Sequence, residues 1–234
     1  MREKCTAVVL AAGSGRRMQS HVAKQYLLLH GKPVLWYALQ VFEESKIIDE
    51  VILVVGKGEI PYCQQEIVER YGFRKVVHVI EGGAERYLSV WEALKGIDEQ
   101  GILFIHDGAR PFVSEKILED TYEAVLEHGA CVTGIPVKDT IKISDENGFA
   151  VQTPNRKTVW QVQTPQVFDA KLIVEAYREL IENLEEIKAA GIEITDDAMV
   201  VETMKAKAVK LVKGSYENIK ITTPEDMNIA QSLL

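Results

Sequence analysis

The chain has 234 residues, of which 27 are lysine or arginine and 35 are aspartate or glutamate, so its net charge is −8. Hydrophobic residues make up 47% and charged residues 26% of the sequence, proportions that exclude a wholly disordered chain. The acidic balance argues against a general nucleic-acid binder, and no apolar run approaches the roughly 20 residues of a membrane span.

The three cysteines show no zinc-binding or redox spacing, which favours buried thiols in a reducing compartment. Residues 1–12 resemble a signal peptide only superficially, because their apolar run is short and leads into a glycine-rich loop. We therefore expect a cytoplasmic protein with no membrane segment.

Short β-branched runs alternate with amphipathic stretches along the first half of the chain. The predicted strands cover residues 6–10, 51–55, 76–80, 102–105 and 130–135. The predicted helices cover residues 34–44, 62–71, 86–96 and 114–128, the last with Ser114 as its N-cap. This order predicts an α/β fold: one Rossmann-like domain over residues 1–234, with a mostly parallel twisted sheet and helices on both faces.

Residues 138–162 break this alternation and predict a two-stranded β-arm inserted in the domain. Residues 140–144 alternate in polarity, Asn147-Gly148 is a strong hairpin turn, and residues 149–152 form the second strand. Because an isolated hairpin is marginally stable in water, we expect the arm to pack on another surface, such as a second subunit.

The remaining chain predicts three helices and two strands. The helices cover residues 169–190, 196–204 and 224–234, the last capped by Thr223 with Pro224 in its first turn. The strands cover residues 208–212 and 219–221.

Residues 10–18, directly after the first strand, form the strongest candidate site. Small residues let a backbone approach a ligand closely, and successive N–H groups can surround an anion. Arg17 and Lys24 add cations that suit a polyphosphate. The alternative, a tight turn with solvated arginines, is less favoured because the small residues and the cations occur together. The small residues are Ala11, Ala12, Gly13 and Gly15.

This loop matches neither of two common phosphate-binding motifs. A dinucleotide-binding fingerprint requires a third glycine where Met18 stands, and the lysine–serine or lysine–threonine ending of a P-loop is absent.

Two further strand ends carry candidate residues. Asp107 follows the strand at 102–105 and suits a metal–phosphate complex or a hydroxyl, while Arg110 suits a phosphate. Their ordinary alternative is a capped turn with an internal ion pair. Gly83 and Ser89 suit the close approach of a flat base, and the alternative there is a turn that leads into a helix with Arg86 in surface pairs.

The ordered motifs resemble those of the 2-C-methyl-D-erythritol 4-phosphate cytidylyltransferase family, from residue 8 to residue 226. The motifs are Leu-Ala-Ala-Gly-x-Gly-x-Arg-Met, Lys-Gln-Tyr, Gly-Gly-x-x-Arg-x-x-Ser, His-Asp-x-Ala-Arg-Pro, Pro-Val-x-Asp-Thr, Thr-Pro-Gln, Thr-Asp-Asp and Asn-Ile-Lys-x-Thr-x-Pro-Glu-Asp. The resemblance implies transfer of a cytidylyl group from CTP to methylerythritol phosphate in isoprenoid synthesis, with a divalent cation, usually Mg²⁺. It also implies a homodimer joined through the β-arm, and no nucleic-acid or membrane partner.

The resemblance also assigns roles to individual residues. Arg17, Lys24, Arg156 and Lys220 are the expected catalytic residues. The small residues of the loop are expected around the CTP phosphates and ribose, and Gly83 and Ser89 at the cytosine. Arg156, and with it Thr140, is expected to reach the acceptor from the partner subunit. The other expected substrate-binding residues are Arg86, Asp107, Arg110 and Thr164. One position departs from the family, because many members have aspartate where Ala84 stands.

Three rival functions remain open on sequence grounds. A cytidylyltransferase acting on ribitol 5-phosphate shares the glycine loop and the arm. An inactive nucleotide-binding regulatory protein is disfavoured by Arg17, Lys24 and Lys220, and an NAD-dependent dehydrogenase is disfavoured by Met18.

Overall fold

The computed structural model describes residues 2–13, 18 and 22–234, which build a seven-stranded sheet in the order β11-β7-β10-β6-β1-β4-β5. All neighbouring pairs are parallel except those that β10 makes with β6 and β7. The strands are β1 (Cys5–Ala11), β4 (Glu50–Val55), β5 (Val76–Glu81), β6 (Ile102–Asp107), β7 (Ala130–Pro136), β10 (Trp160–Asp169) and β11 (Lys210–Lys213). The predicted α/β fold is confirmed.

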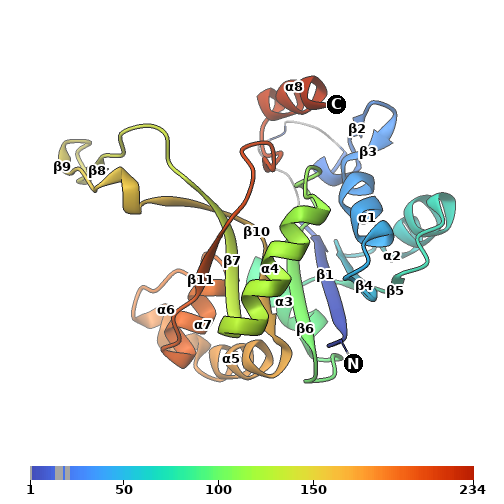
Figure 1. Ribbon diagram of the computed structural model, residues 1–234, viewed down its shortest axis with the longest axis horizontal. Coiled ribbons are helices and arrows are strands. Elements are labelled where there is room, and N and C mark those ends of the chain that lie inside the picture. The colour runs from blue at the N-terminus through green and yellow to red at the C-terminus, as the bar shows by residue number, and fades with distance from the viewer. Residues whose placement is uncertain (1, 14–17, 19–21) are drawn as a thin grey trace.

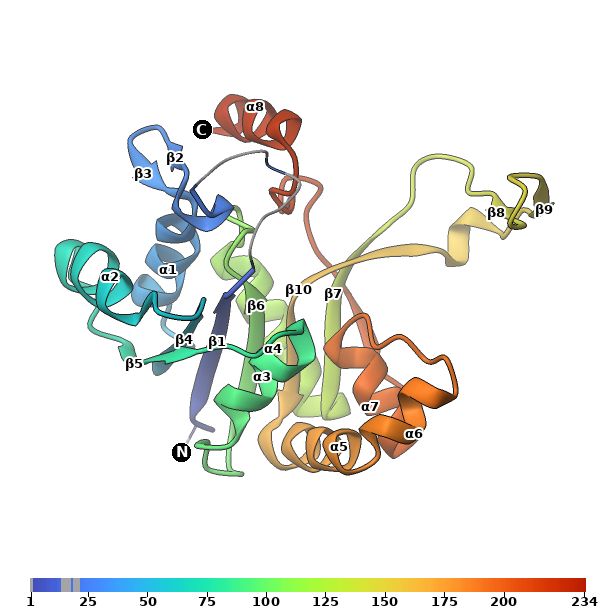
Figure 2. The ribbon, with the colours of Figure 1, turned by 180° about the vertical axis from the view of Figure 1, so that it is seen from behind.

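Helices cover both faces of the sheet (Figures 1 and 2). Alternate residues of β1 point to opposite faces, so Val9 joins one hydrophobic cluster and Val8 the other. The first cluster includes side chains of α1 (Val34–Glu44), α2 (Ile60–Cys63), the π-helix η3 (Gln64–Glu69) and α4 (Glu115–His128). The second includes side chains of α3 (Arg86–Leu94), α5 (Ala170–Glu182), α6 (Leu184–Ala189) and α7 (Asp197–Lys205).

Two helix ends follow the predicted capping chemistry. The Ser114 side chain accepts a hydrogen bond from the backbone N–H of Ile117 at the start of α4. The last helix, α8 (Pro224–Leu233), begins with a capping box between Thr223 and Asp226. These local signals were sufficient to place both helix starts.

The long helix predicted over residues 169–190 is wrong, because it is two helices. Asn183 lies between α5 and α6, and its side-chain amide donates to the carbonyl of Glu179 at 2.8 Å. An asparagine side chain competes in this way for the backbone hydrogen bonds that would continue the helix. After the break, Ile187 of α6 lies in the core, where it is 7% exposed. Asp169 lies outside the helix as its N-cap.

The strand predicted over residues 219–221 is also wrong. Ile221 instead donates one backbone hydrogen bond to the loop carbonyl of Ala109 and is buried beside α8. The unpredicted strand β10 carries Pro165, and its register shifts between Val162 and Gln166. A proline is tolerated inside a sheet at such an irregularity, which explains why the sequence pattern missed this strand. The short pair β2 (Leu28–Leu29) and β3 (Lys32–Pro33) was not predicted either.

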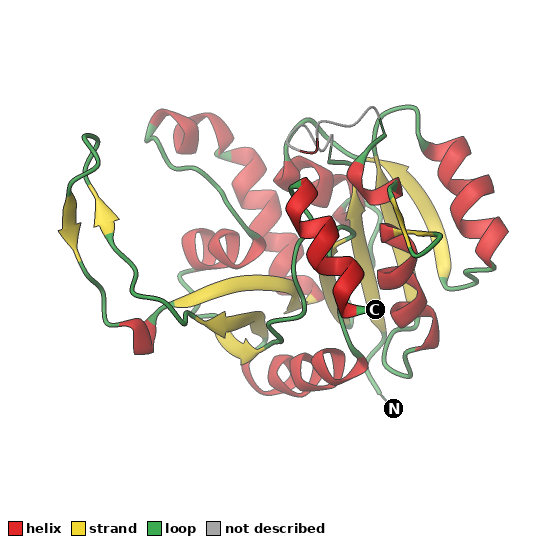
Figure 3. Ribbon diagram, turned by 90° about the horizontal axis from the view of Figure 1, so that it is seen from above, coloured by secondary structure: helices red, strands yellow, loops and turns green. Residues whose placement is uncertain are grey.

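The segment between β7 and β10 extends away from the sheet and ends in a hairpin of β8 (Ile143–Ser144) and β9 (Ala150–Gln152) (Figures 1 and 3). Apolar side chains on this hairpin are exposed, among them Phe149 at 72% and Val151 at 65%. Among the described residues, no helix is both long and apolar enough to cross a membrane.

The carboxyl end of β6 is held by a buried histidine. His106 is fully buried, with Phe42 packed edge-on against its ring. Its Nδ1 lies 3.1 Å from Thr164 Oγ1, and its Nε2 lies 3.2 Å from the carbonyl of Arg110. Because the Arg110 carbonyl can only accept, we assign the proton of the neutral ring to Nε2, so that Nδ1 accepts from the Thr164 hydroxyl, which itself accepts from the N–H of Asp107. A neutral imidazole thus fixes the turn that carries Asp107 and Arg110.

This burial makes His106 a source of acid sensitivity. Burial lowers the pKa of His106 from its usual 6.5 to about 4, although the charge of Asp107 opposes that shift. Between pH 6.5 and pH 4 the unfolded chain therefore takes up a proton that the folded chain excludes. We expect the free energy of unfolding to fall by about 3 kcal/mol across this window through His106 alone.

Denaturant unfolding at a series of pH values measures this contribution. His106→Gln should remove that slope between pH 6.5 and pH 4, whatever its effect at pH 7. His78→Gln, at an exposed position of β5, is the control that should retain it. An unchanged slope in His106→Gln would show that other groups cause the acid sensitivity.

Candidate active site

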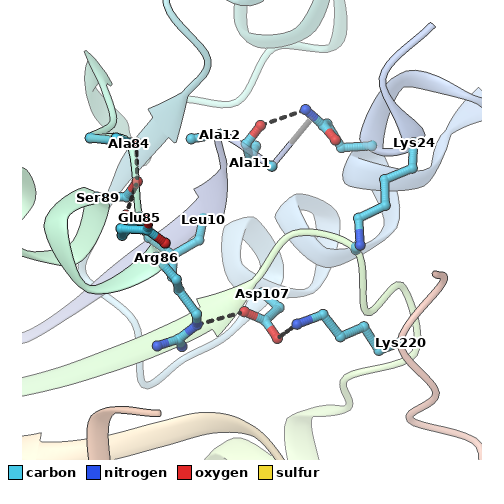
Figure 4. Close-up of a pocket in the computed structure, with 14 residues that line it drawn as sticks. Leu10, Ala11, Ala12, Lys24, Ala84, Glu85, Arg86, Ser89, Asp107 and Lys220 are labelled. Atoms are coloured by element: carbon cyan, nitrogen blue, oxygen red, sulfur yellow. Dashed lines mark hydrogen bonds and ion pairs between the residues drawn. The ribbon is translucent and has the colours of Figure 1, made fainter. Parts of the chain in front are cut away.

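Two adjoining cavities lie at the carboxyl edge of the sheet. The larger has a volume of about 410 Å³ and is lined by the segments that follow β1, β5 and β6, together with Lys24 and Lys220 (Figure 4). The smaller, of about 260 Å³, shares Arg86, Asp107 and Lys220 with it. Parallel strands bring their following loops to one edge, which is where open α/β sheets bind ligands.

Gly83 lines one wall of the larger cavity, and neither it nor Gly82 beside it leaves room for a side chain. A Cβ on Gly82 would lie 2.7 Å from the Cβ of Ala12, and one on Gly83 would lie 2.4 Å from the Cβ of Leu88. Ser89 is buried beside them, and its hydroxyl donates to the carbonyl of Glu85 at 3.1 Å. The wall is therefore closely packed backbone, which a flat group can approach.

A short 3₁₀-helix, η2 (Lys24–Tyr26), brings Lys24 to the opposite wall. Gln25, which is buried, donates from Nε2 to the carbonyl of Ala11 at 2.5 Å and so ties this turn to the end of β1. Tyr26 anchors the other side by donating to Glu59 Oε2 at 2.8 Å. Figure 4 shows the Lys24 side chain extending into the cavity from this anchored turn.

Asp107 is the electrostatic centre of the pocket. Its Oδ2 lies 2.8 Å from Lys220 Nζ and 3.8 Å from Arg110 Nε, and its Oδ1 lies 3.4 Å from Arg86 Nε. Burial would raise the pKa of Asp107, but the charges of Arg86 and Lys220 outweigh that effect and hold the pKa well below its usual range. Asp107 is therefore a carboxylate at any pH at which the protein works.

Arg86 is also paired on its other side, with a carboxylate of α7. Its Nη1 and Nη2 contact the two oxygens of Asp197 at 2.8 Å and 2.7 Å. Asp197 is fully buried and also accepts from the Tyr177 hydroxyl at 2.6 Å. Burial would lower the pKa of Arg86, but the charge of Asp197 reverses that effect and raises it. Arg86 is thus a fixed cation between two carboxylates.

Arg110 and Thr164 line the smaller cavity. Arg110 donates from Nη1 to the carbonyl of Asn218 at 2.7 Å, which fastens the loop before α8 to the turn after β6. Its Nε is buried and has no hydrogen-bond partner among the described residues. The sequence suggested that this guanidinium would fork onto a phosphate, but both terminal nitrogens donate to backbone carbonyls, Nη1 to Asn218 and Nη2, at 3.4 Å, to Val162.

The expected site residues fall into four groups. Those that line the larger cavity are Ala11, Ala12, Gly13, Lys24, Gly83, Arg86, Ser89, Asp107 and Lys220. Arg110 and Thr164 line the smaller one. Thr140 and Arg156 are exposed on the arm and line neither cavity of their own chain. Gly15 and Arg17 lie outside the described residues.

Three residues that support the pocket received no role from the sequence. Gln25 and Asp197 stand in motifs of the family resemblance, but neither they nor Tyr177 carry a local signal of a long-range hydrogen bond. Asp196 serves as the N-cap of α7, and only the complete burial of Asp197 shows that this second acid needs another partner.

Known proteins are similar to this chain over nearly its whole length. The family model described as 2-C-methyl-D-erythritol 4-phosphate cytidylyltransferase matches residues 5–234. The chain is 52% identical over 225 residues to the enzyme of that name from Lachnospira eligens, covering 96% of each chain. It is 49% identical over 232 residues to the one from Lachnoclostridium phytofermentans, covering 99% of this chain and 97% of the relative.

Solved structures that carry the name of this enzyme are also similar to the chain. The 4-diphosphocytidyl-2C-methyl-D-erythritol synthase of Anaerococcus prevotii superposes with a TM-score of 0.82 at 37% identity, covering 99% of this chain and 96% of that one. The Francisella tularensis 2-C-methyl-D-erythritol 4-phosphate cytidylyltransferase gives a TM-score of 0.80 at 30% identity, covering 99% and 100%. This chain belongs to the 2-C-methyl-D-erythritol 4-phosphate cytidylyltransferase family.

Proposed function

We propose that the two adjoining cavities are the active site of a cytidylyltransferase. As a member of its family, the chain joins CTP and 2-C-methyl-D-erythritol 4-phosphate to give 4-diphosphocytidyl-2-C-methyl-D-erythritol and pyrophosphate, in the non-mevalonate route to isoprenoids. The observation that carries the assignment is the convergence of Lys24, Asp107 and Lys220 on one cavity whose backbone walls are glycine and alanine.

CTP occupies the larger cavity in this proposal. The cytosine lies against the wall of Gly83 and Ser89, and the ribose and phosphates lie along residues 11–13 and the glycine loop after them. Ala84 has no side-chain donor or acceptor, so the backbone around it reads the base. Lys24 faces the phosphates from the opposite wall, and Arg17 is proposed to stabilise the same charge on the α-phosphate.

The acceptor occupies the smaller cavity. Lys220 lies between the two cavities and pairs with Asp107, so it suits a phosphate that must approach the α-phosphate of CTP. Thr164 and Asp107 offer oxygen partners to the polyol hydroxyls. This arrangement brings the acceptor phosphate and CTP to a shared boundary formed by Arg86, Asp107 and Lys220.

The chemistry needs no general base or covalent intermediate, because the nucleophile is a phosphate oxygen that is already ionised at pH 7. Two anions must meet, so charge repulsion and alignment are the main obstacles. The lysines and arginines oppose the repulsion, and a rigid pocket supplies the alignment. One fixed cation of this kind is worth about 3 kcal/mol, or roughly a hundredfold in rate.

Mg²⁺ is proposed to be held chiefly by the substrate. No group of three or more histidine, cysteine, aspartate or glutamate side chains in the described part of the chain could hold a metal ion. Mg²⁺ commonly binds through substrate phosphates with one or two carboxylates. Asp107 is the buried carboxylate in position to assist, and the ion would neutralise phosphate charge when bound.

We propose that residues 1–234 form a single domain and that its arm is a segment of that domain. In a homodimer, the arm is proposed to complete the active site of the second subunit. Thr140 and Arg156 lie outside both cavities of their own chain, so their proposed contacts with the acceptor require a partner. The exposed apolar hairpin supports such an interface, because side chains such as Phe149 would be buried there.

We also propose a cytoplasmic location, supported by three buried cysteines that form no disulfide.

Pyrophosphate release tests the activity and the acceptor together. The purified chain with CTP, Mg²⁺ and 2-C-methyl-D-erythritol 4-phosphate should release pyrophosphate, whereas ribitol 5-phosphate should give a kcat/KM at least about a hundredfold lower. Equal or faster turnover with ribitol 5-phosphate would favour the related wall-polymer enzyme. No release with either acceptor would favour an inactive nucleotide-binding protein.

Lys24→Ala should lower kcat about a hundredfold, because the charge that builds on the α-phosphate loses a fixed partner. Its thermal unfolding midpoint should stay within about 2 °C of the wild type. Lys57→Ala removes an exposed lysine that lines neither cavity and should leave kcat unchanged. Wild-type turnover in folded Lys24→Ala would reject the role of Lys24 in catalysis.

Arg156→Ala should raise the Michaelis constant for the acceptor at least about tenfold and that for CTP less than about twofold, because only the acceptor phosphate loses a charged partner. Lys157→Ala, the next residue of the same 3₁₀ turn η4 (Arg156–Thr158), is the matched control. Steady-state kinetics in both substrates distinguishes them, and equal effects on the two Michaelis constants would refute the assignment.

Mixing variants tests whether the site is shared between subunits. In a heterodimer of Lys24→Ala and Arg156→Ala chains, one of the two sites contains both wild-type residues. Random reassociation of equal amounts should therefore restore about a quarter of wild-type activity at acceptor concentrations where each variant alone is nearly inactive. No recovery after confirmed exchange of subunits would place Arg156 in its own chain's site.

A further inference from the structure

The ion pair between Arg86 and Asp197 joins a residue that lines both cavities to a carboxylate that lines neither. Arg86 is the first residue of α3, Asp197 the first of α7, and Tyr177 belongs to α5. These three helices pack on the same face of the sheet. The buried Asp197 therefore links the core of that face to a cation that lines both cavities.

Asp197 and Asp107 compete for the same guanidinium. Asp197 takes both terminal nitrogens of Arg86 at 2.8 Å and 2.7 Å, which leaves Asp107 a longer contact of 3.4 Å to Nε. A two-pronged pair fixes the plane of a guanidinium as well as its position. Arg86 consequently cannot turn its terminal nitrogens toward Asp107.

The consequence falls on Lys220. Asp107 Oδ2 lies 2.8 Å from Lys220 Nζ, while its other near cation, Arg110 Nε, is 3.8 Å away. If Asp197 no longer held Arg86, the Arg86 guanidinium would form a bidentate ion pair with Asp107. That pair would displace the single contact between Asp107 and Lys220 Nζ. The Lys220 ammonium would then lose the partner that holds it at the boundary of the two cavities.

We propose that Asp197 is a positioning residue for the acceptor: by holding both terminal nitrogens of Arg86, it reserves Asp107 for Lys220 and so fixes the Lys220 ammonium where the acceptor phosphate binds. Tyr177 supports this by donating a hydrogen bond to Asp197 Oδ1 at 2.6 Å. This inference rests on the proposed role of Lys220 in acceptor binding.

Asp197→Asn tests the inference, because asparagine keeps the size of the side chain and an acceptor for Tyr177 but removes the charge that holds Arg86. The Michaelis constant for 2-C-methyl-D-erythritol 4-phosphate should rise roughly tenfold, the value of one charge-assisted hydrogen bond. The Michaelis constant for CTP should change less than about twofold, because Gly83 and Ser89, the proposed cytosine contacts, make no contact with Asp197.

Thr121→Val is the control for a purely structural effect. Thr121 is buried in α4, lines neither cavity, and donates its hydroxyl proton to the carbonyl of Ile117 at 2.7 Å. The variant should lower the thermal midpoint and leave both Michaelis constants unchanged. The same pattern in Asp197→Asn would overturn the inference.

A double-mutant cycle with Lys220→Ala separates this inference from the proposed function. Lys220→Ala alone should raise the acceptor Michaelis constant, and if it does not, the acceptor site is wrongly placed and the inference falls with it. If it does, adding Asp197→Asn should raise that constant less than about twofold further. A full tenfold increase in both backgrounds would leave the proposed function intact and overturn the route through Lys220.

Tyr177→Phe provides a second variant if Asp197→Asn does not fold. It removes one hydrogen bond from Asp197 and leaves the ion pair in place, so the acceptor Michaelis constant should rise about two- to threefold with that for CTP unchanged. No change in either constant would count against the positioning role.

Discussion

The ion pair between Asp107 and Lys220 joins the end of β6 to the loop that precedes α8, and the cations of the site are arranged around it. Several cations gathered without a substrate repel one another, and a buried carboxylate among them lowers that cost. Three cations, Arg86, Arg110 and Lys220, face two carboxylates, Asp107 and Asp197. The cluster therefore keeps a net positive charge, and Lys24 adds to it on the opposite wall.

The topology of the sheet explains why such a cluster forms at this edge. The parallel strands β6 and β1 are neighbours, and β5 lies two strands away from β1, beyond β4. The segments at their carboxyl ends, including Asp107, line the larger cavity. The antiparallel strand β10 lies between β6 and β7, carries Thr164 to the smaller cavity, and begins where the chain returns from the arm. One strand thus connects the proposed acceptor site to the proposed dimer arm.

Much of this fold is predictable from the sequence because its central strands are continuous β-branched runs and its helix caps are local. The five strands predicted before residue 136 all occur, each extended by one or two residues. The failures have long-range causes. Strand β10 contains a proline that only its sheet neighbours accommodate, Asn183 breaks a helix whose composition favours continuity, and residues 219–221 take their partners from a loop and a helix instead of a strand.

The site is less predictable than the fold because the residues that face the substrates and the residues that hold them in place come from different parts of the chain. Gly83 and Asp107 carry a local signal because each follows or ends a parallel strand, and parallel topology brings those strand ends to one edge of the sheet. Asp197 is 90 residues beyond Asp107 in sequence, and its partner Arg86 lies 111 residues before it. An acid at the first position of a helix is stabilised there by the helix dipole, so its sequence context explains it fully. Only its complete burial shows that it needs a cation, and only the packing of α3, α5 and α7 shows which one.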